Sequence, residues 1–101
     1  MYKIVFFVPE AHKEAVKQAI FDAGAGRIGR YECCSWETLG QGQFRPLDGA
    51  DPFIGAVGEI ERVAEYRVEL VCEDALIQHA IKALKAAHPY EGPADDVLKM
   101  A

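Results

Sequence analysis

Four consecutive residues near the C-terminus could do chemistry: His88, Pro89, Tyr90 and Glu91. Imidazole and carboxylate groups are ligands that Zn²⁺, Cu²⁺ and Mn²⁺ accept, so His88 and Glu91 are candidate ligands of a divalent metal. A small organic ligand is a further alternative that stays open, with Tyr90 as an additional binding residue. The run also suits a structural helix stop, because Pro89 cannot continue a helix and a histidine is favourable at the negative C-terminal end.

A second candidate site lies between Gly40 and Gly58, where five glycines and two prolines interrupt any regular element. Irregular segments of this length are usually functional or form interfaces. The segment also carries apolar residues such as Phe53, which need cover from a second subunit, from a ligand pocket between subunits, or from the chain's own sheet. We therefore take Arg45 and Phe53 as candidate ligand-binding residues.

Catalytic motifs find little support in the sequence. His12 and His79 have no obvious nucleophile beside them, and nothing in the sequence activates Cys34. Cys33 and Cys34 should point to opposite sides of a strand, which is a poor arrangement for joint metal binding, and Cys72 alternates with core residues. The sequence thus predicts a protein that is not an enzyme.

The composition indicates one soluble globular domain covering residues 1–101. A net charge of -5 and a pI of about 5.1 disfavour nucleic-acid partners and anionic membranes. No leader-like segment or apolar run long enough for a bilayer is present, so the expected compartment is the cytoplasm. Three cysteines, two of them adjacent, do not form a secreted disulfide framework.

Hydrophobic periodicity predicts four strands and two helices in the order βαββαβ. A strand apolar on both faces comes first, and we expect it to be central. The expected ranges are strands at 2–8, 28–38, 64–72 and 94–100, with helices at 10–23 and 74–88. This order predicts an α+β ferredoxin-like sandwich, with an antiparallel sheet and two helices on one face.

Several short motifs together resemble the insert domain of the YqfO group of Nif-three-like proteins. The motifs are Val8-Pro9-Glu10, Gly24-Ala25-Gly26-Arg27-Ile28-Gly29, Cys34-Ser35, Gly42, Phe44-Arg45-Pro46-Leu47, Gly49-Ala50, Pro52-Phe53-Ile54-Gly55, Glu65, Arg67 and His88-Pro89-Tyr90-Glu91. The last motif also recurs in CutA-type divalent-cation-tolerance proteins, which are relatives of the PII signalling fold. The chain departs from the family at Gly92-Pro93-Ala94-Asp95-Asp96, where a Glu and a Tyr are replaced.

The resemblance implies a PII/CutA-like domain that assembles as a homotrimer through its sheet edges and long hairpins. It also implies that the dinuclear metal site of the full-length Nif-three-like proteins lies in domains that flank this one. The leading hypothesis is therefore a non-catalytic oligomeric binding or regulatory module whose ligand is unknown. Two alternatives stay open: a divalent-metal-binding protein that uses His88 and Glu91, and an accessory domain of a separately encoded metal-dependent hydrolase.

Overall fold

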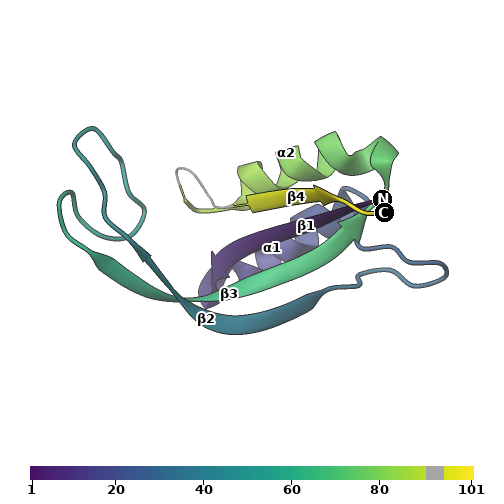
Figure 1. Cartoon of the computed structure of the whole chain (residues 1–101), viewed down its shortest axis with the longest axis horizontal. Coiled ribbons are helices and arrows are strands. Elements are labelled where there is room, and N and C mark those ends of the chain that lie inside the picture. The colour runs from purple at the N-terminus through teal and green to yellow at the C-terminus, as the bar shows by residue number, and fades with distance from the viewer. Residues whose placement is uncertain (91–94) are drawn as a thin grey trace.

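The computed structural model describes residues 1–90 and 95–101. Its elements follow the predicted order, with one additional 3-10 turn before the second helix (Figure 1). They are β1 (Tyr2–Pro9), α1 (Glu10–Asp22), β2 (Trp36–Phe44), β3 (Glu61–Cys72), the 3-10 turn η1 (Asp74–Leu76), α2 (Ile77–Ala87) and β4 (Asp95–Lys99).

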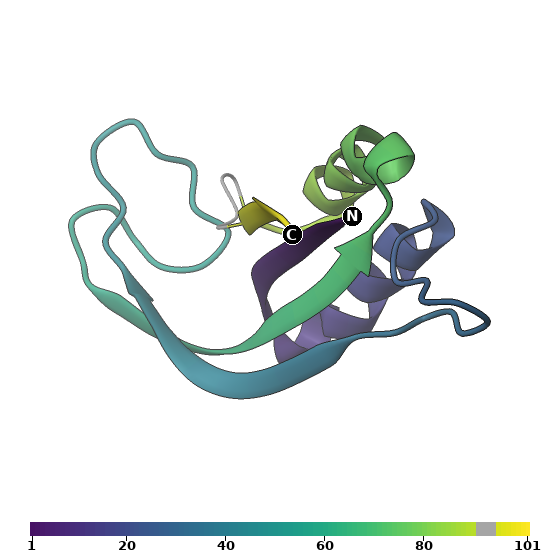
Figure 2. The same ribbon diagram turned by 45° about the vertical axis from the view of Figure 1, so that its right-hand side comes forward.

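The four strands form one antiparallel sheet in the order β2-β3-β1-β4. Strand β1 is a central strand, as its apolar sequence predicts, and it pairs along its whole length with β3 from Tyr2↔Cys72 to Pro9↔Glu65. Strands β2 and β3 form a long hairpin that extends past the end of β1 and curves away from the sheet (Figure 2). This hairpin carries the loop that joins β2 to β3 to one end of the molecule.

The hydrophobic core lies between the sheet and the two helices, which both cover the same face (Figure 2). Alternate residues of β1 and β3 point toward the helices, because side chains alternate between the two faces of a strand. The buried cluster joins Ile4, Phe6, Val8, Val68, Leu70 and Cys72 of the sheet to Val16, Ile20, Ile77, Ala80 and Leu84 of the helices. The ferredoxin-like α+β sandwich predicted from the sequence is confirmed.

Two predicted boundaries were wrong. The second strand begins at Trp36 rather than at residue 28, since Ile28 and Tyr31 form only an isolated bridge and Cys33 has a positive φ of 58°. The same strand continues through Gly40 and Gly42 to Phe44, inside the segment we expected to be irregular from residue 40. Pairing with the long strand β3 overrides the low strand propensity of these glycines.

A cluster of charges fixes helix α1 to the start of β2. The ammonium groups of Lys13 and Lys17 lie 2.5 Å and 2.9 Å from the carboxylate oxygens of Glu37, and Lys13 also lies over the ring of Tyr66. The hydrogen bond to Lys13 is the main reason that the pKa of Glu37 lies below its ordinary value. These contacts hold the base of the hairpin against the helical layer.

The two ends of the chain lie together, at the end of the molecule opposite the β2–β3 loop (Figure 1). The backbone N–H of Met100 donates to the carbonyl of Met1 at 3.0 Å. The loop end of the molecule is therefore remote from the termini, and the candidate site lies there.

Neither helix in the described ranges is long and apolar enough to cross a membrane.

Candidate functional site

His88 connects the end of α2 to the central strand. Its backbone is extended, at φ -74° and ψ 137°, as expected for a residue that precedes a proline. Only 6% of the residue is exposed. Its Nδ1 accepts a hydrogen bond from the Tyr90 backbone N–H at 3.1 Å, so Nε2 carries the proton and donates to the Phe7 carbonyl oxygen at 2.6 Å.

The His88 ring is held neutral as well as fully bonded. Burial lowers its pKa below the ordinary value of 6.5, and the nearby His12 lowers it further against the opposing effects of the Phe7 carbonyl and Asp95. A metal could bind either ring nitrogen only by displacing one of the two hydrogen bonds. Within residues 1–90 and 95–101, no group of three or more His, Cys, Asp or Glu side chains is placed to hold a metal ion.

A pocket of about 300 Å³ lies beside this turn, between the β2–β3 loop and residues of β1, β2 and β3. Its apolar walls come from three parts of the chain and include Phe7, Phe44, Pro46, Pro52, Phe53 and Tyr90. Tyr90 is the shared neighbour of the rings, with centroids 6.1 Å from Phe44 and 6.5 Å from Phe53. His88 packs behind Tyr90, at 4.9 Å between ring centroids, and so supports the wall without lining the pocket.

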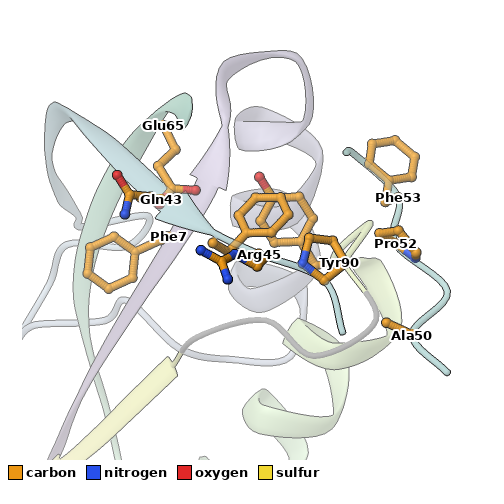
Figure 3. A pocket seen from close by; sticks show the side chains of 10 residues that line it. Phe7, Gln43, Arg45, Ala50, Pro52, Phe53, Glu65 and Tyr90 are labelled. Carbon is orange, nitrogen blue, oxygen red and sulfur yellow. The ribbon is translucent and has the colours of Figure 1, made fainter. Parts of the chain in front are cut away.

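Three polar side chains enter the same pocket: Gln43, Arg45 and Glu65. Figure 3 shows Gln43 and Glu65 on one side of it, Pro52 and Phe53 on the other, and Arg45 in the middle of the view. A neighbouring hollow along β2 and β3 is lined by Phe7, Gln43 and Glu65 as well. Glu65 therefore stands where the two hollows meet.

Glu65 reaches this position because its neighbour on β2 has no side chain. A Cβ atom on Gly42 would collide with the Glu65 carboxyl group, whereas the space above Gly40 is empty. Burial raises the pKa of Glu65 above its ordinary value of 4.5, with a smaller opposing effect from Tyr90. Burial and then the negative charge of Glu65 raise the pKa of Tyr90.

The Tyr90 hydroxyl group is the polar group of the pocket that lacks a hydrogen-bond partner among the described residues. It is enclosed, and it has no hydrogen bond of ordinary geometry to any residue that the structure describes, although Glu65 lies close enough to affect its pKa. A buried hydroxyl without a partner costs roughly 1–3 kcal/mol. A ligand that supplies a partner here would recover part of that free energy.

The raised pKa of Glu65 predicts that this carboxyl destabilises the folded chain at neutral pH. Because the folded state binds this proton more tightly than the unfolded state does, the contribution to stability is favourable below pH 4.5 and is lost as the pH rises through the folded-state pKa. Glu65→Gln should therefore raise the thermal midpoint at pH 7 but not at about pH 4. Thermal unfolding at both pH values measures this, with the exposed Glu59→Gln as control; a lower midpoint for Glu65→Gln at pH 7 would contradict it.

The candidate residues from the sequence fall into three groups. Arg45, Phe53 and Tyr90 come together in one pocket, although the sequence placed them in two separate candidate sites. His88 lies next to the pocket with both ring nitrogens bonded, and Glu91 lies outside the described residues. Asp95 lies near His88, and its Oδ2 is buried without a partner in the described part of the chain.

Sequence reasoning missed Phe7, Gln43 and Glu65. The alternation of Glu59, Glu61, Glu65 and Glu69 with apolar residues is typical of a solvated strand face, and it hides the role of Glu65. One available signal was that Phe7 is large and apolar on the outer face of a central strand. The other was a glycine within a strand, which often marks a close approach by another group.

The chain is similar over nearly its whole length to part of several longer proteins. It is 51% identical over 98 residues to a GTP cyclohydrolase 1 type 2 homolog of Mycobacterium bovis, covering 97% of the chain and 26% of the relative. A protein of the same description from Halalkalibacterium halodurans is 40% identical over 101 residues, covering all of the chain and 27% of that relative. The chain thus spans about a quarter of the relatives it matches. No family model matches it.

Solved structures agree with the sequence comparison. The Bacillus cereus protein related to NIF3 superposes with a TM-score of 0.84 at 42% identity, over 98% of this chain and 25% of that one. The periplasmic divalent cation tolerance protein CutA from Archaeoglobus fulgidus superposes with a TM-score of 0.69 at 16% identity, over 99% of this chain and 84% of that one. The first match confirms the predicted resemblance to the Nif-three-like proteins, and the second shows the CutA-like fold.

Proposed function

We propose that this chain works as a single non-catalytic domain that binds a small organic molecule at the loop end of its sheet. It matches about a quarter of the length of the NIF3-related protein. The observation that supports this most is the pocket that brings Arg45, Phe53 and Tyr90 together with the half-buried carboxyl of Glu65. Its volume is at the lower end of the range for small-molecule sites. Burying Glu65 and Tyr90 costs stability, and such groups concentrate at functional sites.

A binding role fits the pocket better than a catalytic one. No serine, cysteine, histidine or lysine is among the described residues that line it. The remaining polar groups can orient a ligand by hydrogen bonds and charge, but none is a nucleophile with a base beside it. The activity named in the longer relatives would then belong to their other three quarters.

The test of this proposal is native mass spectrometry of the protein purified without chelators, because one spectrum reports the oligomer mass and any retained adduct. A retained organic adduct that Tyr90→Ala loses would support the proposal. An adduct retained equally by both proteins would place binding elsewhere, and a metal ion lost with His88→Gln would favour the divalent-metal alternative.

We propose further that the domain is a homotrimer, as its resemblance to the CutA-type proteins implies. Strand β2 is an edge strand, and its large apolar side chains Trp36 and Leu39 are both 60% exposed. Leu98 and Met100 are exposed at the other side of the sheet. Exposed apolar groups on open strand edges favour association with other chains.

The trimer predicts that a charge on the β2 edge will dissociate the assembly. Trp36→Glu should give a monomer in analytical ultracentrifugation while circular dichroism stays unchanged, because the side chain is outside the core. Gln78→Glu, which adds the same charge on the exposed surface of α2, should remain trimeric. A wild-type monomer, or a trimer that tolerates Trp36→Glu, would contradict the assembly through this edge.

A second candidate function is that of an accessory domain acting with a separately encoded metal-dependent hydrolase. It is favoured by the position of the two chain ends, which lie together and leave the pocket at the far end free to face a partner enzyme. The test is to add this domain to the remaining part of a longer relative and measure turnover of GTP. A change in turnover that depends on Tyr90 would support an accessory role, and no change would count against it.

A further inference from the structure

We infer that the ligand of this pocket is a planar heteroaromatic compound that presents a pair of N–H donors on one edge and carries a negatively charged substituent. The inference rests on the proposed function, since it specifies what the same pocket binds. Three features of the pocket carry it: the aromatic walls, the carboxyl of Glu65 and the guanidinium of Arg45.

The walls select a flat ring system. Phe7, Phe44, Phe53 and Tyr90 line the pocket from β1, β2, the β2–β3 loop and the turn after α2. Aromatic rings prefer offset or edge-to-face contacts with other aromatic groups at centroid distances of about 4.5–7 Å. The existing ring contacts of Tyr90 fall in that range, so a planar ligand would join a cluster that is already arranged.

Glu65 selects hydrogen-bond donors on the ligand. Its carboxyl group has two acceptor oxygens, and in the described part of the chain no lysine or arginine forms an ion pair with it. Two parallel N–H groups on one edge match a carboxylate in the way that an arginine fork does. A ligand without donors would exclude water from this carboxyl and leave it only the neighbouring Tyr90 hydroxyl, at a cost that disfavours purely apolar compounds.

Arg45 selects the negative substituent. The group is exposed to solvent, and none of the seven ion pairs between described residues includes it. Arginine binds carboxylate and phosphate groups through a planar fork of donors. A single compound can donate hydrogen bonds to Glu65 and form an ion pair with Arg45 through its negative group, so it would bind both charged side chains of the pocket.

Four matched probes separate these requirements. 2-Amino-4-oxo-3H-quinazoline-6-carboxylate has the donor edge and the anion, and 2-amino-3H-quinazolin-4-one has the donor edge only. Quinoline-6-carboxylate has the anion only, and quinoline has neither. Isothermal titration of each into the full chain should give the tightest binding for the first, with at least a tenfold loss when either group is missing.

Two variants locate each group. Glu65→Gln should remove the advantage of the donor edge while keeping that of the carboxylate, and Arg45→Met should do the reverse. Quinoline binding as tightly as the first probe, at a site lost in Tyr90→Ala, would overturn the inference while leaving the proposed pocket intact. If none of the four probes binds, and a diverse fragment library also finds no ligand for the pocket, the proposed function fails together with the inference.

Discussion

Replacing His88 with alanine is expected to lower the free energy of unfolding by about 2–4 kcal/mol, because it removes a buried ring and two hydrogen bonds. The Phe7 carbonyl and the Tyr90 N–H would each lose their partner. For a domain of this size the thermal midpoint should fall by roughly 10–20 °C. Thermal or urea unfolding measures the change.

The matched control is His79→Ala on the exposed side of the same helix, which should change stability by less than about 0.5 kcal/mol. The metal hypothesis makes the opposite prediction for His88, namely that alanine abolishes metal uptake without unfolding the chain. A His88→Ala protein as stable as His79→Ala would show that the two hydrogen bonds contribute little and would return His88 to the role of a ligand.

The pH dependence separates these roles further. Burial lowers the pKa of His88, so the unfolded chain takes up a proton at this residue before the folded chain does. Its contribution to stability is present above the ordinary pKa of 6.5 and declines as the pH falls through the folded-state pKa. His88→Ala should therefore show a weaker loss of stability between neutral and acid pH than the wild-type chain.

The second large effect is expected at Gly42. A Cβ atom at this position would collide with the Glu65 carboxyl, so Gly42→Ala must move that side chain out of its place between the two hollows. Because Glu65 is a flexible side chain and Gly42 has ordinary strand geometry, the fold should tolerate the change. We expect ligand affinity to fall at least tenfold while the thermal midpoint changes little.

Gly40→Ala is the control for this prediction. It adds the same methyl group two residues earlier on the same strand, where no atom lies within 4 Å of the added Cβ. Titration of 2-amino-4-oxo-3H-quinazoline-6-carboxylate into both variants makes the comparison. Equal affinities for the two variants would mean that Glu65 does not need its present position for binding.

The overall fold was predictable because its signals are local. The alternation along residues 64–72, the apolar first strand and the helical stripes each follow from the period of the element that contains them. The breaker-rich segment was predicted only in part, since pairing with β3 extends the second strand through two glycines. Strand pairing depends on a partner distant in sequence, which a local pattern does not contain.

The candidate site was less predictable than the fold for the same reason. Arg45, Phe53 and Tyr90 were identified separately, but their meeting depends on the curvature of the hairpin. Glu65 alternates with apolar residues and carries no local sign of burial, because its cover comes from Gly42, Tyr90 and the loop. His88 was identified correctly as a distinctive residue, yet its two hydrogen-bond partners could only be assigned in three dimensions.

The most direct test of the central claim is a fragment screen of the ¹⁵N-labelled wild-type chain by NMR, with amide shift changes assigned to residues. If the pocket is the binding site, the largest changes caused by fragment hits should occur at Phe7, Phe44, Phe53, Glu65 and Tyr90, and Tyr90→Ala should abolish them. Hits that shift other surfaces only, or the absence of any hit that shifts these five amides, would contradict it.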